Sequence, residues 1–383
     1  MISMNAKNNK KARPGVALLV VLFIVMAITI LSLGFVSRSD VELACGQNMV
    51  MRTQMDYLAE SGLEHARGLI LNPQDVSSPD EYWKGGTNLQ LTSGSDFYEV
   101  RVDREANDFC NYIIECNSYR RAPEGNDIGR SSLRAELRLD PCIAYWAGES
   151  TTISSRIAIT GDVYCNGTLI NNGTIDGDAF ATSNISGTIT GRKNESVTLS
   201  YPVAWPNLSV TDFEPMYYIG ATLYSAQQIV GVDIPSPGLL TDVQYCTGNV
   251  NMPDNVTING TLVVGGDLTI SGINNVITAQ PNFPALVVGG QVLIKDGSSL
   301  VINGLAQIRG PIAFEPGVIN ANIQVTGGLF INSGGIEGIT SSSVVVSITA
   351  APAIASIETW TVDGTSKRWR PAAGAFYRSI ERK

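Results

Sequence analysis

The stretch VALLVVLFIVMAITILSLGFV, from Val16 to Val36, carries no charged side chain and follows directly on a glycine, Gly15. At 1.5 Å per residue its roughly 21 positions form a helix about 31 Å long, which matches the hydrocarbon thickness of a bilayer. We therefore predict that this segment is a membrane-spanning helix.

Charges on the two sides of this apolar stretch differ. Basic side chains precede it, at Lys7, Lys10, Lys11 and Arg13, whereas the first charges after it are of mixed sign. This asymmetry favours a cytoplasmic N-terminus and an outward-facing remainder of the chain. A cleaved signal peptide is the alternative, but its apolar core would run about 7 to 15 residues and end at a small-residue cleavage site. Ser37 follows the stretch without such a site.

The helical pattern continues well beyond the apolar stretch. Apolar or small residues recur every three or four positions, at Val41, Ala44, Met51, Met55, Leu58, Ala59, Gly62, Ala66 and Leu69. This spacing predicts an amphipathic helix continuous with the first one. The result is a single rod from Val16 to about Leu71, roughly 84 Å long, which Asn72 and Pro73 end.

The basic arm, Gly15, the apolar helix and the stretch Tyr57-Leu58-Ala59-Glu60-Ser61-Gly62-Leu63-Glu64 together resemble the minor pilins of type IV pili. The resemblance is closest to the X-type minor pilin and to the K-type minor pseudopilin of type II secretion. It implies that a prepilin peptidase of the bacterial inner membrane cuts between Gly15 and Val16 and methylates the new terminus. It also implies that other pilins or pseudopilins are the partners, and we expect a helix seam around Met55, Leu58, Ala59 and Glu60 to serve packing.

One position departs from the major pilins, which carry a glutamate at the fifth mature residue to neutralise the terminal amine of a neighbouring subunit. This chain has Val20 there. A buried carboxylate is tolerated only when it is paired, so Val20 cannot offer that contact to the subunit toward the tip. The K-type tip subunit also lacks the glutamate, and Val20 therefore favours a tip or initiating role.

Residues 72–140 contain three segments that alternate apolar and polar side chains, namely DFYEVRVDR, FCNYIIECNSY and RSSLRAELRLD. Alternation broken by turn-rich stretches predicts an antiparallel meander. We expect it to pack on the distal half of the helix as a small pilin-like α+β head, with Asn72 to Ser95 as the connecting loop.

Residues 141–383 are poor in charge and rich in Gly, Asn, Thr, Ser, Val and Ile. A turn-then-strand phrase recurs at Asn166-Gly167-Thr168-Leu169, Asn172-Gly173-Thr174-Ile175, Ser186-Gly187-Thr188-Ile189 and Asn259-Gly260-Thr261-Leu262. Short β-branched strands punctuated by Gly and Asn predict a β-solenoid, expected to be right-handed, whose turns stack on their neighbours. The fold class is thus mainly β with one long helix, and a β-sandwich is the alternative for this region.

Two segments of this region interrupt the repeats. Residues from Tyr201 to Ser236 are predicted to form an excursion that separates a first small stack from a second, with a short helix from Ala221 to Val230. The C-terminal segment holds a basic island with Phe376 and Tyr377, and its charged members are Lys367, Arg368, Arg370, Arg378, Arg382 and Lys383. We interpret this island as a cap over the last rung, with contact to a polyanion or a glycan as the alternative.

Composition excludes several functions. A net charge of -9 argues against nucleic-acid binding. The single histidine, His65, lies on the helix, and no Cys or His spacing indicates zinc, so we predict neither an enzyme nor a cofactor. Asp162, Asp176 and Asp178 could bind calcium or perform acid-base chemistry on polysaccharides, although Asp-Gly-Asp is also typical of a corner. Cys142 or Cys165 could pair with Cys110 or Cys116, but the sequence leaves the connectivity open.

Two functions follow from these patterns. The favoured one is a minor pilin or pseudopilin-like structural subunit, anchored once in the bacterial inner membrane, with its β-rich head periplasmic or on the cell surface. The alternative is a membrane-anchored β-solenoid that binds or cleaves a polysaccharide and does not polymerise. Processing at Gly15 separates the two hypotheses.

Overall fold

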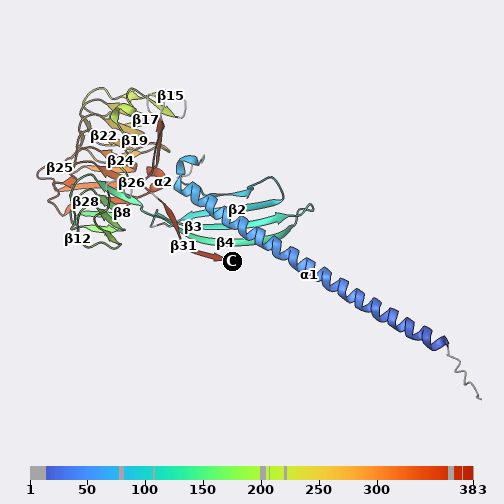
Figure 1. Ribbon diagram of the computed structural model, residues 1–383. Coiled ribbons are helices and arrows are strands. Elements are labelled where there is room, and N and C mark those ends of the chain that lie inside the picture. Colours follow the sequence, from blue (N-terminus) through green and yellow to red (C-terminus); the bar gives the residue numbers. More distant parts are fainter. Residues whose placement is uncertain are drawn as a thin grey trace, which may run out of the picture.

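The computed structural model describes residues 14–76, 82–106, 108–198, 204–206, 208–219, 222–360, 366–372 and 374–382. One long helix lies on a five-stranded antiparallel sheet, here called the head, and a β-solenoid stands beside the head (Figure 1). The predicted fold class, mainly β with a long N-terminal helix and a β-solenoid, is confirmed.

Helix α1 runs from Pro14 to Leu71 without interruption and ends where Asn72 and Pro73 predicted. The Asn72 side-chain amide donates to the Gly68 carbonyl at 2.8 Å, and Pro73–Asp75 forms a 3-10 turn, η1. The predicted stripe is buried from Met55 onward, whereas Val41 and Ala44 are exposed because the head does not reach them. Leu63 and Ile70 join the buried face, which Leu69 only borders.

The head has the strand order β1-β2-β3-β4-β31. Its strands are β1 (Gly85–Leu89), β2 (Asp96–Arg104), β3 (Asn111–Arg121), β4 (Asp127–Leu139) and β31 (Ala375–Arg382). The predicted meander is confirmed in β2, β3 and β4, which pair antiparallel in sequence order. The stretch Asn72 to Ser95 is not all loop, because β1 pairs with β2. Gly85, with φ of 110°, allows this approach, since a Cβ there would lie 1.9 Å from the Val100 carbonyl oxygen.

The C-terminal basic segment does not cap the solenoid as expected. Strand β31 returns to the head and pairs antiparallel with β4. Its Arg382 lies 3.1 Å from the Asp56 carboxylate of α1, and Arg370 donates to the Leu71 carbonyl at 3.0 Å. Arg382 therefore faces the acidic side of the helix, and Arg370 lies at its carbonyl end, where a cation is favourable. The solenoid is thus inserted between two neighbouring strands of the head.

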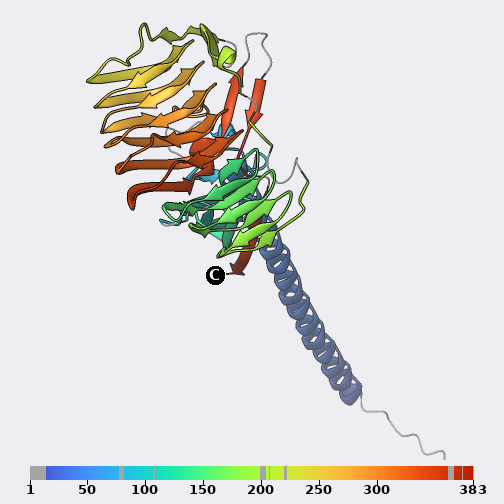
Figure 2. The same ribbon diagram turned by 90° about the vertical axis from the view of Figure 1, so that its left-hand side faces the viewer.

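The solenoid consists of short parallel strands in stacked turns, visible edge-on in Figure 2. Its first series is β5 (Ile143–Ala147), β6 (Thr151–Ile153), β7 (Ile157–Thr160), β8 (Asp162–Cys165), β9 (Leu169–Asn171), β10 (Thr174–Asp176), β11 (Ala179–Ala181), β12 (Ile185–Gly187) and β13 (Lys193–Asn194). Its second series is β16 (Gln227–Gln228), β17 (Gly238–Cys246), β18 (Val250–Met252), β19 (Val256–Val264), β20 (Leu268–Ile270), β21 (Asn275–Thr278), β22 (Leu286–Val288), β23 (Val292–Ile294), β24 (Ser299–Ile308), β25 (Ile312–Phe314), β26 (Asn320–Ile331), β27 (Ile336–Glu337) and β28 (Ser343–Ala350).

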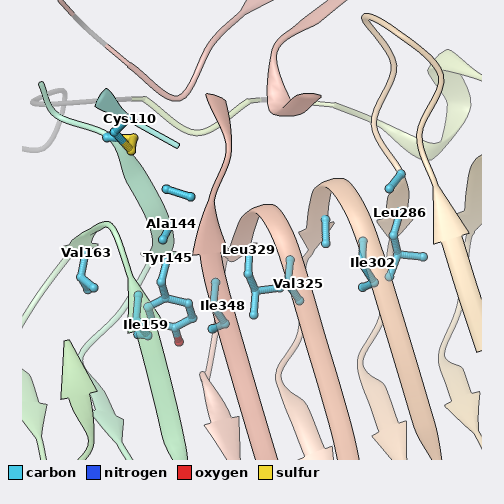
Figure 3. Close-up of a cluster of buried hydrophobic side chains, with 14 of the residues drawn as sticks. Cys110, Ala144, Tyr145, Ile159, Val163, Leu286, Ile302, Val325, Leu329 and Ile348 are labelled. Atoms are coloured by element: carbon cyan, nitrogen blue, oxygen red, sulfur yellow. A yellow bond between two sulfur atoms is a disulfide. The ribbon is translucent and has the colours of Figure 1, made fainter. Parts of the chain in front are cut away.

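The two series form one continuous stack rather than two separate ones. The longest sheet has the order β13-β11-β8-β5-β26-β24-β21-β19-β17-β16, so the chain enters at β5 in the middle and builds outward to β13. It then restarts at β16 at the far end and returns, until Leu329 of β26 pairs with Tyr145 of β5. Figure 3 shows Tyr145, Leu329 and Ile348 side by side in the core at this junction. Joining the series buries a rung face that each would otherwise expose.

The excursion between the two series covers an outward face of the stack. It contains the 3-10 turn η2 (Val210–Asp212) and the strands β14 (Met216–Ile219) and β15 (Thr222–Ser225), and β14 pairs with β29 (Ile357–Trp360), which pairs with β30 (Ser366–Trp369). A short helix, α2 (Pro352–Ala355), precedes β29. The predicted helix at Ala221–Val230 is wrong, because β15 and β16 occupy this stretch. Tyr217 and Tyr224 stack across the hairpin, with ring centroids 5.5 Å apart.

Candidate assembly helix and polar neck

The exposed half of α1 is the first candidate functional surface. Every side chain described from Val16 to Val50 is exposed, and most are apolar. Val20 is half exposed. This helix is long and apolar enough to cross a membrane once. A large exposed apolar surface marks a membrane or protein contact.

The predicted packing seam lies in the other half of α1. Met55 and Ala59 are fully buried and Leu58 is nearly so, all against the head of the same chain. Glu60 is exposed and lies 3.9 Å from Arg382 of β31. The three apolar seam residues are therefore occupied within the subunit, which corrects the expectation that they pack against neighbours. Periodicity identified the buried stripe but could not tell which surface would cover it.

The predicted processing site lies at the start of α1. The helix begins at Pro14, so the peptide bond between Gly15 and Val16 follows the second helical residue, and the Val16 side chain is exposed. The basic residues Lys7, Lys10, Lys11 and Arg13 lie outside the described residues. Cleavage at Gly15 stays a prediction.

Two of the three aspartates singled out in the sequence, Asp162 and Asp178, lie where the solenoid joins the head, in a cluster we call the polar neck: Arg138, Asp140, Asp162, Asp178 and Arg192. Asp162 is fully buried, and its carboxylate accepts the backbone N–H groups of Cys142 at 2.6 Å and Asp178 at 2.8 Å. The Arg138 guanidinium of β4 lies 3.4 Å away. Burial raises the pKa of Asp162 to about 6, although its hydrogen-bond donors and Arg138 oppose this.

Asp178 and Asp176 have different surroundings. Arg192 donates through Nε at 2.8 Å and through Nη2 at 2.5 Å to the Asp178 carboxylate. Burial acts to raise the pKa of Asp178, but Arg192 outweighs it and holds that pKa below its usual value. Asp176 is exposed and accepts the Thr190 hydroxyl at 2.9 Å. The carboxylates of Asp162 and Asp178 are thus engaged by donors of the chain itself.

Neither chemistry suggested for these aspartates gains support from this arrangement. Within the described ranges, no group of three or more His, Cys, Asp or Glu side chains is placed to hold a metal ion. The corner interpretation of Asp176-Gly177-Asp178 agrees with Gly177, whose φ is 159° and whose Cβ would collide with the Gly161 carbonyl at 2.3 Å. The polar neck does connect the head to the solenoid, since Arg138 of β4 contacts Asp162 of β8.

Two features of the neck were not identified from the sequence. Arg138 and Arg192 belong to a strand and a turn that showed no special motif, so only their spatial proximity reveals them. Cys110 forms a disulfide with Cys142, one of the pairings left open, while Cys116, Cys165 and Cys246 are buried and unpaired and Cys45 is exposed. The bond joins the turn before β3 to the point where the chain leaves the head.

No known protein family matches the sequence, and no curated protein matches it. A solved structure to which it is similar is the competence-associated pilin ComZ from Thermus thermophilus, at 11% identity and a TM-score of 0.26, covering 87% of this chain and 97% of that chain. The structure itself defines a mainly β protein with one apolar N-terminal helix, an antiparallel head and a β-solenoid inserted into that head.

Proposed function

We propose that this protein is a membrane-anchored, pilin-like structural subunit, of the minor pilin or pseudopilin type, in a type IV pilus or a type II secretion pseudopilus. One observation carries the proposal. Helix α1 is a single element whose C-terminal part is locked into the head while Val16–Val50 projects from it as an exposed apolar rod. Such a rod can lie in the inner membrane and then pack among the apolar helices of other subunits without refolding.

The orientation and the processing enzyme follow from the sequence around the rod. The basic arm before Val16 favours a cytoplasmic N-terminus, with the head and the solenoid periplasmic or on the cell surface. Gly15 supplies the small residue at which a prepilin peptidase would cut, and Val16 would become the methylated terminus. No enzymatic activity is proposed, since the candidate aspartates are committed to the polar neck or to a corner.

A position at the tip of the assembly agrees with two features. Val20 lacks the carboxylate with which a subunit would hold the terminal amine of its neighbour toward the tip. The solenoid lies at the end of the head remote from the rod (Figure 1). In a stack of parallel helices, that volume would be needed by the next subunit along the axis, whereas at the tip it is unoccupied.

The proposal is tested by the mass of the N-terminal peptide in membrane fractions and in filaments sheared from cells. A methylated Val16 terminus in sheared filaments is the expected result. Gly15→Leu should leave the protein membrane-bound and unprocessed, while Gly34→Ala is the matched control, because a Cβ at Gly34 meets nothing within 4 Å. An intact Met1 terminus confined to membranes, or normal processing of Gly15→Leu, would contradict the proposal.

A further inference from the structure

The two ends of the solenoid are finished differently. At the β12–β13 end, side chains close the last turn: Glu195 accepts the Ile185 N–H at 2.7 Å and Lys193 donates to the Gly187 carbonyl at 2.6 Å. Asn194 donates to the Ala179 carbonyl at 3.3 Å. This end has the polar terminal cap that a stack of repeats requires for solubility.

The opposite end is open and apolar. In the described part of the chain, β17 pairs with β19 along its whole length, but on its other side it pairs only at Gln244 and Tyr245, with β16 and with the Ile229 N–H that follows β16. The backbone of the preceding stretch, Gly238–Val243, therefore presents a strand edge. Leu239 is 66% exposed on this stretch, and Val230 and Val232, at 87% and 70%, are exposed on the segment between β16 and β17, which runs beside β18. An exposed apolar strand edge is a template on which another strand can pair.

The charge of this end is one-sided. No Lys, Arg or His occurs from Leu208 to Ile294, whereas six acidic residues do: Asp212, Glu214, Asp233, Asp242, Asp254 and Asp267. Two of those at the open end have neutral partners, since Asp233 accepts from Asn251 Nδ2 at 2.7 Å and Asp254 accepts the Ile273 N–H at 2.8 Å. The surface around the open edge is thus acidic, and its charge complement is basic.

We propose that the open end of the solenoid is a docking site for an extended, basic segment of another protein, which adds as a strand to the free edge of β17. Its backbone would pair with Gly238–Val243, an apolar side chain would cover Leu239, and its Lys or Arg side chains would face Asp242 of this edge and Asp233 and Asp254 of the neighbouring segments. A second copy of this end is disfavoured as the occupant, because two such acidic surfaces repel each other. The site lies at the end of the molecule farthest from the start of α1 (Figures 1 and 2), where a partner outside the membrane can reach it.

The experiment uses the full chain in lipid nanodiscs and a fluorescent peptide of alternating Val and Lys as the probe. Anisotropy titrations should show binding that weakens as salt rises and that is absent for a peptide of alternating Val and Glu. Leu239→Lys should weaken binding at least about tenfold, because it adds a like charge at the edge. Ile319→Lys is the matched control, since Ile319 is 65% exposed on another coil, and it should bind as the unaltered chain does.

Further measurements separate strand addition from simple charge attraction. A Val/Lys peptide with N-methylated backbone amides keeps its charge but cannot pair as a strand, and it should not bind. Equal binding of this peptide, equal binding of the Glu peptide, or equal losses in Leu239→Lys and Ile319→Lys would each overturn the proposal. So would a dimer in analytical ultracentrifugation that Leu239→Lys abolishes, since a second copy would then occupy the edge. These outcomes are independent of processing at Gly15.

Discussion

Leu139 and Ala375 face each other across the antiparallel pair β4–β31, although the whole solenoid lies between them in the sequence. The pairing continues as an isolated bridge between Cys142 and Ala372. The chain therefore leaves and re-enters the head at one place, through two neighbouring segments. The two ends of the solenoid thus lie close together. A unit with neighbouring termini can be inserted into another domain without disrupting the core of either, which explains how the head accommodates the solenoid.

The first prediction concerns the disulfide at this crossing. Cys110 and Cys142 are 32 positions apart, with Cα atoms 6.1 Å from each other. Closing a loop of this size stabilises a fold by about 3–4 kcal/mol in the chain-entropy account. We expect the double substitution Cys110→Ser, Cys142→Ser to lower the free energy of urea unfolding by roughly that amount.

The matched control for the disulfide variant is Cys45→Ser, since Cys45 is unpaired and exposed on α1. This variant should unfold as the unaltered protein does. Equal stability of the double variant and the unaltered protein would show that the disulfide does not contribute to the fold of the head.

The second prediction concerns the contact between α1 and the head. A Cβ on Gly62 would lie 2.3 Å from the Cys116 Sγ and 2.9 Å from the Tyr98 ring. Gly62→Ala should therefore destabilise the head by about 1–3 kcal/mol through overpacking, as measured by thermal unfolding. Adding Cys116→Ala should restore part of the loss, because the two changes share one contact.

The control for Gly62 lies on the same helix. Gly68 has nothing within 4 Å of its added Cβ, so Gly68→Ala should be neutral or stabilise the helix by up to about 1 kcal/mol. Equal effects of Gly62→Ala and Gly68→Ala on thermal unfolding would show that close packing at Gly62 does not stabilise the contact between α1 and the sheet.

Local patterns were sufficient to predict the helix, the meander and the solenoid. The period of the apolar residues, the alternation in β2 to β4 and the Asn-Gly turns are each properties of neighbouring residues. The order of stacking could not be predicted in this way, because parallel rungs of similar composition can join in several orders. That β26 pairs with β5 rather than leaving two separate stacks depends on contacts between distant residues.

The C-terminal strand and the neck show the same limit. The alternation in Ala375–Arg382 could have indicated a strand, but a basic segment after a solenoid equally suits a cap. Strand β31 instead pairs with β4, whose edge would otherwise be open, and its Arg382 contacts acidic residues of α1 such as Asp56. Asp162 was singled out as a possible ligand or acid-base carboxylate, but the donors that engage it, the Cys142 and Asp178 N–H groups and the Arg138 guanidinium, lie in other strands or turns.

The third prediction concerns the excursion between the two series of strands, which covers an outward face of the solenoid. Phe213 is buried at 1% exposure, with its ring centroid 6.4 Å from that of Phe283. Phe213→Ala should cost about 3–5 kcal/mol, the usual loss for a large core aromatic. Phe376 is 59% exposed on β31, and Phe376→Ala should change the unfolding midpoint little. Similar losses of stability in Phe213→Ala and Phe376→Ala would show that Phe213 does not pack into a core between the excursion and the solenoid.

The last prediction is a pH dependence that arises from Asp162. Burial raises the pKa of its carboxyl in the folded protein to about 6, above the value near 3.9 of an unfolded chain. The folded state therefore binds the proton more tightly than the unfolded state does. The stabilisation from protonation is complete below the unfolded pKa and is lost as pH rises through the folded pKa. Between pH 7.5 and pH 5 the free energy of unfolding should rise by about 1 kcal/mol from this group.

Urea titrations at several pH values measure this dependence, with Asp162→Asn as the comparison. Because the amide cannot titrate, the free energy of unfolding of the variant should change less between pH 7.5 and pH 5 than that of the unaltered protein. Asp178 affects the free energy of unfolding in the opposite direction. Arg192 holds the pKa of Asp178 in the folded protein below its usual value, so the stabilisation from the ionised carboxylate is lost only as pH falls below the pKa of the unfolded chain. The two effects therefore occupy separate pH windows. Equal pH slopes of the unaltered protein and Asp162→Asn between pH 7.5 and pH 5 would show that Asp162 stays ionised, held so by Arg138 and the two backbone N–H groups, throughout that range.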